Sequence, residues 1–473
     1  MTSAPAPRFP RGFRFGAATA AYQIEGATAE DGRGVSIWDT YSHTPGATAE
    51  GATGDVACDH YHRYREDVAL LRELGADTYR FSIAWPRIVP EGTGRVNPAG
   101  LDFYDRLVDE LLAAGIEPAP TLYHWDLPQA LEDTGGWRVR GTAEAFADYA
   151  AVVAERLADR AGRWMTLNEP FCTAFVGHAI GRHAPGTREG NGALAVVHHL
   201  LVGHGLAVDA LRAAGAREVG IALNPDRLLP ATGSAADAEA VARAEILHNR
   251  CWFDPIFLGR YPDGEKEVWG DISDFSFRRD GDLELASRPL DFCGVNYYRP
   301  ITVADAPWRE SDPARRTAVD IRAEETWGDD SVRRTTMDWP VVPSSFRDLL
   351  VDLTRRYPGL PPIVITENGS AEADVADDDG TVHDSDRVHY LRDHLDALAQ
   401  AVAEGVDVRA YYVWSLLDNF EWAFGYDRRF GIVRVDYDTL QRTPKDSYRW
   451  YRDFIAAERA AHTGPLPQAG PAS

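Results

Sequence analysis

The stretch Arg163-Trp164-Met165-Thr166-Leu167-Asn168-Glu169 is a short β-rich run that ends in an amide and a carboxylate. Seven further runs of this kind occur, and each is followed by polar, aromatic or carboxyl residues. The runs cover residues 13–18, 78–83, 116–122, 163–167, 219–223, 292–295, 363–366 and 410–413. Longer amphipathic stretches separate them, at residues 61–74, 101–114, 143–161, 193–214, 236–258, 343–357 and 384–403. Strand-like runs that alternate with helical patterns indicate βαβ units and a parallel sheet.

Eight such units predict a fold of the α/β class, a single (β/α)8 TIM barrel. The residues that follow each run would line its C-terminal mouth, together with long loops at residues 26–59, 302–336 and 370–384. An open, doubly wound sheet is the alternative, but the first turn lacks the GxGxxG pattern. We expect one catalytic barrel over residues 9–461, with disordered termini at residues 1–8 and 462–473.

The composition excludes several classes of protein. Of 473 residues, 44% are hydrophobic and 11% aromatic, which is too apolar for a disordered chain. The net charge of −24 disfavours nucleic acid and anionic membranes as partners. Cys58, Cys172, Cys251 and Cys293 form no CxxC motif, and no apolar run reaches the length of a membrane span. The expected protein is soluble and cytoplasmic, with reduced thiols.

Two carboxylates, Glu169 and Glu367, each follow a buried strand, where an unpaired charge would be costly. Two salt-bridged loop residues would also explain them. Arg80 is predicted to point into the same mouth, and many aromatic and amide residues follow the strands: Gln23, Trp85, His124, Trp125, Asn168, Asn296, Tyr298, Trp414, Trp422 and Phe430. Such a pocket suits a neutral polyhydroxylated ligand. Paired carboxylates hydrolyse glycosidic bonds.

Seven motifs together resemble the β-glucosidases of glycoside hydrolase family 1, over residues 9–455. They are FGAATAAYQIEG (15–26), RFSIAWPR (80–87), YHWDLP (123–128), TLNEP (166–170), VNYY (295–298), ITENG (365–369) and WSLLDNFEW (414–422). The resemblance implies a retaining, exo-acting β-glucosidase. Its substrates would be cello-oligosaccharides or aryl and alkyl β-glucosides, cleaved through a covalent glycosyl-enzyme. It implies no cofactor and no metal.

The resemblance also assigns roles to individual residues. Glu367 would be the nucleophile and Glu169 the general acid and base. Arg80 and Tyr298 would contact Glu367, and Asn168 would bind the 2-hydroxyl. The remaining substrate-binding residues would be Gln23, His124, Trp125, Asn296, Trp339, Trp414, Glu421, Trp422 and Phe430. Among these, Phe430 would lie against the 6-position and Trp339 would support the leaving group.

Glu421 argues against a 6-phosphate on the sugar, because like charges repel. The phospho-β-glycosidases of the family have Ser there, with a Lys nearby. Glu169 argues against the plant thioglucosidases, which lack the acid/base carboxylate. A non-catalytic sugar-binding protein is disfavoured because both carboxylates are present. Galactosidase or fucosidase activity and transglycosylation stay open, as does a homo-oligomer.

Some residues have simpler explanations or depart from the family. His198, His199 and His204 lie on one helical stretch, and packing explains them better than a metal site. Cys172, three residues after Glu169, is expected to be a packed thiol near the mouth, and a thiol whose modification blocks the pocket is the alternative. Asp338 stands where the family usually has Gly, which implies a different leaving-group pocket. The resemblance further implies a cis peptide bond near Trp414–Ser415.

Overall fold

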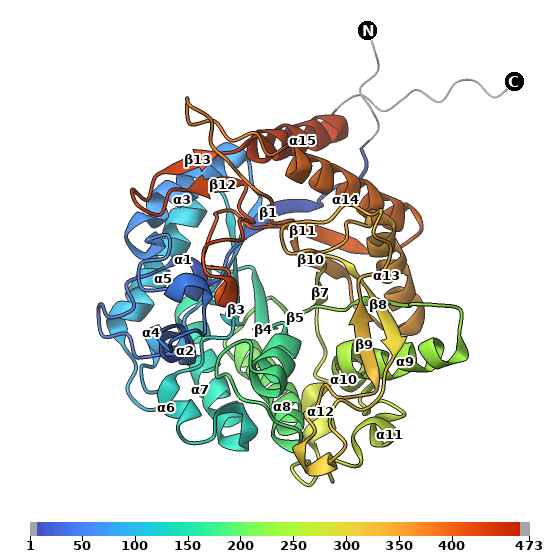
Figure 1. Ribbon diagram of the computed structural model, residues 1–473. Helices are drawn as coiled ribbons and strands as arrows, with labels where there is room; N and C mark the ends of the chain where they lie inside the picture. Colours follow the sequence, from blue (N-terminus) through green and yellow to red (C-terminus); the bar gives the residue numbers. More distant parts are fainter. Residues whose placement is uncertain (1–6, 464–473) are drawn as a thin grey trace, which may run out of the picture.

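A closed barrel of eight parallel strands forms the centre of the molecule (Figure 1). The computed structural model describes residues 7–463. Around the barrel the strands follow the order β1-β11-β10-β7-β5-β4-β3-β2. Their bounds are β1 Arg14–Ala18, β2 Thr78–Ser82, β3 Glu117–Tyr123, β4 Arg163–Asn168, β5 Glu218–Leu223, β7 Phe292–Asn296, β10 Ile363–Asn368 and β11 Val408–Trp414. The predicted (β/α)8 barrel is confirmed.

Helices surround the barrel on all sides in the view of Figure 1. The long ones are α3 His60–Leu74, α5 Pro98–Ala113, α7 Arg140–Leu157, α8 Asn191–Ala213, α9 Ala235–Glu245, α13 Pro343–Arg356, α14 Ser385–Ala403 and α15 Asp446–Thr463. Shorter ones are α1 Ala21–Ile24, α2 Ile37–Ser42, α4 Trp85–Ile88, α6 Gln129–Glu132, α10 Cys251–Phe253, α11 Glu265–Trp269 and α12 Asp282–Ala286. The predicted helix at 236–258 is divided, because π-helical turns at Ile246–Arg250 and Asp254–Leu258 flank α10.

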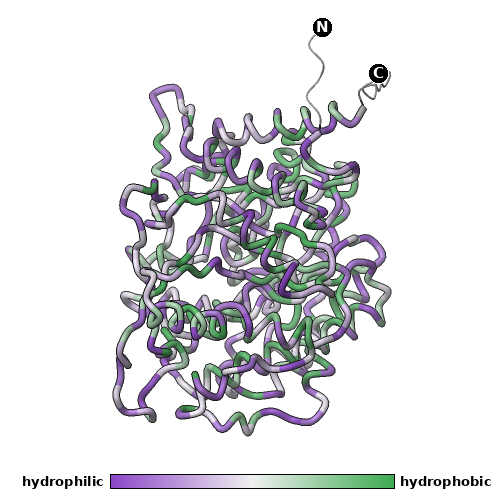
Figure 2. Tube along the Cα trace, turned by 90° about the vertical axis from the view of Figure 1, so that its right-hand side faces the viewer, coloured by the Kyte–Doolittle hydropathy of each residue, from purple (hydrophilic) through white to green (hydrophobic). Residues whose placement is uncertain are grey.

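The helices pack on the barrel through one apolar face. In α13 the buried side chains Phe346, Leu349, Leu350 and Leu353 recur at helical spacing, so they form one stripe. Helix α8 is different, because by length and composition it is apolar enough to cross a membrane, contrary to the sequence-based expectation. Of its apolar window, 83% is buried inside the fold. Its apolarity therefore serves packing. Figure 2 shows the mixture of hydrophilic and hydrophobic residues along the chain.

Two small sheets add to the barrel. One contains β6 (Arg227–Pro230), β8 (Pro300–Asp305) and β9 (Ala323–Thr326), and the other pairs β12 (Val433–Val435) with β13 (Arg442–Pro444). The expectation of an irregular loop at 302–336 was wrong for β8 and β9. The sequence Ala-Glu-Glu-Thr of β9 has no apolar alternation, so only its pairing with β8 makes it a strand. In loop 26–59, Ser36 and Asp39 form a capping box that begins α2.

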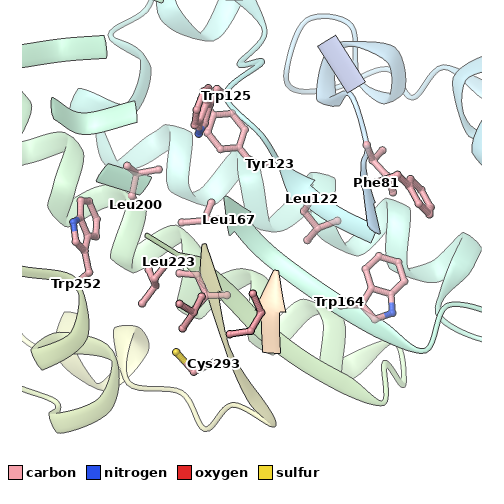
Figure 3. Packing of buried hydrophobic residues seen from close by; sticks show 14 of the residues in the cluster. Phe81, Leu122, Tyr123, Trp125, Trp164, Leu167, Leu200, Leu223, Trp252 and Cys293 are labelled. Atoms are coloured by element: carbon pink, nitrogen blue, oxygen red, sulfur yellow. The ribbon is translucent and has the colours of Figure 1, made fainter. Parts of the chain in front are cut away.

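The core has two parts that meet at the strands. Outward-facing side chains such as Leu122, Leu167 and Leu223 pack under the helices (Figure 3). Inside the barrel, a separate cluster contains many small residues, among them Ala18, Ala119, Ala222 and Ala410. Because these side chains are short, the barrel interior has room for large polar groups at its mouth.

The ends of the described chain are held against the barrel. Arg8 pairs with Asp396, and its backbone N–H donates to Glu458 at 3.1 Å. Helix α15 continues to Thr463, beyond the predicted boundary at residue 461, and packs against α3 and α14 (Figure 1). The expected disorder of residues 1–6 and 464–473 falls outside the described residues.

Candidate active site

Irregular strand pairing at the barrel mouth directs three polar side chains inward. The pairing of β4 with β5 shifts between Met165 and Asn168, and that of β10 with β7 shifts between Ile365 and Glu367. Met165 lies inside the barrel and Leu167 in the outer core. A shift in the strand re-aims the residues that follow it, so Asn168 and Glu367 reach the interior. Glu169 comes next, with a φ of 40° that few residues other than Gly adopt.

Glu367 is buried and bound on both carboxylate oxygens. Arg80 donates to Oε1 at 2.6 Å and Tyr298 donates to Oε2 at 2.6 Å. Burial raises the pKa of Glu367 above its usual value, and the Arg80 charge and both hydrogen bonds limit this rise. The Arg80 charge and the Tyr298 hydroxyl therefore favour the ionised form of this carboxylate.

Glu169 has neutral partners. Asn296 donates to its Oε1 at 2.8 Å, and the Cys172 thiol donates to its Oε2 at 3.2 Å. Burial and, to a smaller extent, the nearby charge of Glu367 raise the pKa of Glu169 to about 8. The two carboxyl groups therefore favour different protonation states near neutral pH: the pair shares one proton, which is favoured on Glu169, and one negative charge, which is favoured on Glu367.

Two asparagines connect the carboxylates. The amide oxygen of Asn168 accepts from Arg80 at 2.5 Å and from Asn296 at 3.1 Å. The Asn168 amide nitrogen consequently faces His124 and donates to its Nε2 at 3.0 Å. Burial lowers the pKa of His124 well below its usual range, so the imidazole is neutral and its proton lies on Nδ1.

Unused hydrogen-bonding groups point to a ligand. Within residues 7–463, the buried Nδ1 of His124 and Oε1 of Gln23 have no hydrogen-bond partner. The Gln23 amide nitrogen donates to Asn419 at 2.9 Å and contacts Glu421 at 3.5 Å. Burial and, to a smaller extent, the charges of Glu367 and Glu169 raise the pKa of Glu421 to about 8. A donor, an acceptor and a carboxyl group on one wall are suited to neighbouring hydroxyls.

Aromatic rings complete the wall and the entrance. The ring of His124 stacks at 5.9 Å from both Trp414 and Trp422, and Trp125 contacts Trp422 at 4.5 Å. The half-buried Trp339 lies 5.3 Å from Tyr298 and 6.1 Å from Phe430. Asp338, which precedes Trp339, has a φ of 61°, a conformation that favours the usual Gly.

Hydrogen bonds, ring contacts and the electrostatic influence of Glu367 and Glu169 on Glu421 connect the predicted catalytic and substrate-binding residues to one another. Trp85, which the sequence placed at the same mouth, instead stacks on Tyr149 at 5.0 Å in the outer core.

The structure also shows supporting contacts that the sequence did not indicate. Thr121 accepts from Arg80 at 3.1 Å, and Thr366 donates to Asn296 at 2.6 Å. Threonine is an ordinary strand residue, so no sequence signal distinguished these two. The Trp414–Ser415 peptide bond is cis, as the resemblance implies.

The other singled-out residues have structural contacts. His204 bonds Thr166 at 2.7 Å, His198 bonds Asp282 at 2.8 Å, and His199 bonds the Trp137 carbonyl at 3.1 Å. These three partners differ, so the histidines do not converge on one point. Cys172 packs against the core, as expected, and its thiol also donates to Glu169.

A closed (β/α)8 barrel with two buried carboxyl groups of different protonation in a pocket of aromatics and amides defines a glycoside hydrolase. Comparison with known proteins gives the same class. The family model of Glycosyl hydrolase family 1 matches residues 6–460, and the chain belongs to this family.

Several relatives match over nearly their whole length. The chain is 51% identical to the thermostable β-glucosidase B of Thermobispora bispora, over 94% of this chain and 90% of the relative. It is 47% identical to a bifunctional β-D-glucosidase/β-D-fucosidase of Bifidobacterium breve, over 96% and 99%. The structure of a family 1 β-glucosidase from Thermotoga maritima superimposes with a TM-score of 0.90 at 43% identity, covering 96% of this chain and 99% of that chain.

Proposed function

We propose that the protein is a retaining, exo-acting β-glucosidase that removes terminal non-reducing β-D-glucosyl residues by double displacement. The observation that supports this most directly is the unequal pair of carboxyl groups. Arg80 and Tyr298 favour the ionised form of Glu367, and burial together with the charge of Glu367 favours the protonated form of Glu169. A nucleophile and an acid in one pocket are what the first displacement requires.

In the first step, a Glu367 oxygen attacks the anomeric carbon and the glycosidic bond breaks. Glu169 gives its proton to the departing oxygen, which leaves as an alcohol. The sugar is then an ester of Glu367, so the negative charge that raised the pKa of Glu169 is gone. Glu169, now ionised and with a lower pKa, is suited to act as a base.

In the second step, Glu169 takes a proton from water, and the water oxygen attacks the anomeric carbon from the face that the leaving group left. The bond to Glu367 breaks, and its carboxylate is restored. Two inversions at the same carbon give net retention. Asn296 donates to Glu169 and to Asn168. Asn168 also accepts from Arg80, which donates to Glu367, so this series of bonds holds the two carboxyl groups in register.

The sugar is proposed to be glucose, because Gln23, His124 and Glu421 present polar groups to vicinal hydroxyls. The carboxyl group of Glu421 offers no positive charge to a 6-phosphate, which disfavours a phosphorylated sugar. A fucosidase activity is the second candidate, because the Bifidobacterium breve relative is named for both activities. Cello-oligosaccharides and aryl or alkyl glucosides are the proposed substrates.

The test is the configuration of the first product, followed by proton NMR during hydrolysis of 4-nitrophenyl β-glucoside. The β-anomer of glucose should appear first, and α-glucose only later by mutarotation. Initial release of the α-anomer would contradict double displacement. Rates on the matching galactoside and fucoside rank the candidate sugars, and a rate on glucoside below both would overturn the choice of glucose.

We also propose that the protein acts in the reducing cytoplasm. Cys58, Cys172, Cys251 and Cys293 are free thiols in the structure, and three of them are buried. This arrangement needs no oxidising compartment. Cell fractionation followed by assay of β-glucosidase activity tests the proposal, and activity confined to the culture medium would contradict it.

A further inference from the structure

Trp327 is unusual among the aromatic residues of this protein. Of the large apolar side chains that the structure describes as exposed, it is the one aromatic ring, and 57% of it is accessible. The other exposed residues of this kind are Val or Leu. A single exposed apolar residue is common on protein surfaces, so the contacts that hold this ring are more informative than its exposure.

The strand pairing brings Trp327 back to the mouth of the barrel. Strand β8 leaves the mouth just after Tyr298, which bonds Glu367. Strand β9 runs antiparallel to it, with Thr326 opposite Thr302. Trp327 follows Thr326 and therefore lies beside the first residues of β8, the end nearest Tyr298. Figure 1 shows β8 and β9 side by side at the edge of the barrel.

Two arginines join Trp327 to Trp339, the ring on the leaving-group side. The Arg334 guanidinium lies over the Trp327 ring, 5.5 Å from its centroid, and donates to the Trp327 carbonyl. It also donates to the carbonyl of Asp338, the residue before Trp339, at 3.0 Å. Arg299 lies 5.6 Å from the Trp339 ring and pairs with Glu325, two residues before Trp327.

Cation–π contact and hydrogen bonds therefore hold the exposed ring on one face. Its other face is presented to solvent in a fixed position. The order outward from the nucleophile is Tyr298, Trp339, Arg334 and Trp327, a series of flat groups that leads away from the site. Flat rigid rings lose little conformational entropy when they bind, which makes them suited to recognising a ligand.

We propose that Trp327 forms an outer aglycone subsite, which stacks on a sugar ring beyond the one that Trp339 supports. This inference rests on the proposed function and specifies its substrate class as β-linked gluco-oligosaccharides of three or more units. The ligand is a neutral sugar chain: the apolar C–H face of a pyranose packs on the ring, and Arg334, Arg299 and Glu325 present donors and acceptors to its hydroxyls.

The test compares kcat/KM for 4-nitrophenyl β-glucoside, cellobiose and cellotetraose in the wild type and in Trp327→Ala. Loss of one aromatic contact should lower kcat/KM for cellotetraose by about 3- to 10-fold. The loss should appear mainly in KM, because the ring lies far from the reacting atoms. The values for cellobiose and the aryl glucoside should stay within about twofold of wild type.

Two further variants sharpen the result. Trp327→Phe keeps a flat ring and should recover most of the affinity for cellotetraose. Trp308→Ala is the matched control, because Trp308 also packs on an arginine in the same 302–336 segment, with Arg316 at 3.7 Å, but has no link to Trp339. It should show no dependence on chain length.

Equal losses on all three substrates, or no loss on cellotetraose, would overturn the outer subsite while leaving the β-glucosidase proposal intact. A wild-type protein that hydrolyses none of the three would instead contradict the proposed function itself. The two failures are therefore distinguishable.

Discussion

At the scale of single residues, the surroundings of Glu169 and Glu367 give two chemically identical side chains different roles. Glu367 has a cation and a phenol as partners, whereas Glu169 has an amide and a thiol. The difference depends on burial as much as on contacts, because both groups are removed from water. A solvent-exposed pair would titrate near the usual carboxyl values and would not divide the proton in this way.

Replacement of Glu169 with Gln should remove general acid catalysis. We expect kcat/KM for cellobiose, which has a poor leaving group, to fall by about 10²- to 10⁴-fold. The loss should be much smaller for 2,4-dinitrophenyl β-glucoside, whose leaving group needs no proton. Equal losses on the two substrates, measured by steady-state kinetics, would show that Glu169 is not the acid.

The same residue sets an expectation for pH. Activity requires protonated Glu169, and its pKa is raised to about 8, so kcat/KM of the wild type should fall as the pH rises through that value. On the acid side, activity should fall as Glu367 becomes protonated. In Glu169→Gln, the alkaline decline should disappear and the acid decline should stay. An unchanged alkaline decline would assign it to another group.

The sequence predicted the identity of most site residues because they lie in motifs near strand ends, whereas Trp339 and Phe430 lie outside the seven motifs. It could not predict how they are held. Asn296 depends on Thr366 and Arg80 depends on Thr121, and both threonines look like ordinary strand residues. The contact of Cys172 with Glu169 was missed for a similar reason, since a thiol near the mouth also suits simple packing.

At the scale of elements, the eight strands were predicted within two residues at each end. An apolar run marks each strand, and a helical pattern marks the segment between one strand and the next. The shifts in pairing within β4 and β10 were not predicted, since no local residue type signals them. They nevertheless decide which side chains enter the barrel. Strand β9 was missed because its residues are mostly polar and its pairing is tertiary.

Gly369 tests the importance of the chain path after β10. A Cβ at this position would lie 1.8 Å from the Trp414 carbonyl oxygen, which is backbone and cannot move aside. Gly369→Ala should therefore displace the end of β10 and lower the free energy of unfolding by about 1–3 kcal/mol. Activity should fall further than stability explains, because Glu367 is two residues away. Thermal unfolding and kcat should be compared with Gly359→Ala, where a Cβ meets nothing within 4 Å. Equal behaviour of the two variants would contradict this account.

At the scale of the whole molecule, a buried charge network ties the C-terminal segment to the loops of the mouth. Lys445 bonds Asp418 at 2.7 Å and also pairs with Asp374, and Arg387 contacts Asp374 at 2.8 Å. Burial alone would raise the pKa of Asp418, but the charges of Lys445 and Arg429 hold it below its usual range. Asp374 follows β10, Asp418 follows β11 and Lys445 precedes α15, so the network joins distant parts of the sequence.

Lys445→Met should leave two buried carboxylates short of one cation. Removing one partner from a buried ion pair costs about 3–5 kcal/mol, so urea unfolding should give a free energy lower by that amount. A loss below about 1 kcal/mol, as for exposed pairs, would mean that the network contributes little. The control is Arg392→Met, which removes an exposed cation paired with Asp393 and should change stability only slightly.

In the proposed mechanism, Glu367 forms a covalent bond with the sugar. Incubation with an activated 2-deoxy-2-fluoro-β-glucoside should trap this ester, because fluorine at the 2-position disfavours the oxocarbenium-like transition state of both steps. Mass spectrometry should show one added fluoroglucosyl group per chain, located on the peptide that contains Glu367, and Glu367→Gln should stay unlabelled. A label on another residue, or turnover of the natural glucoside by Glu367→Gln at the wild-type rate, would contradict the account.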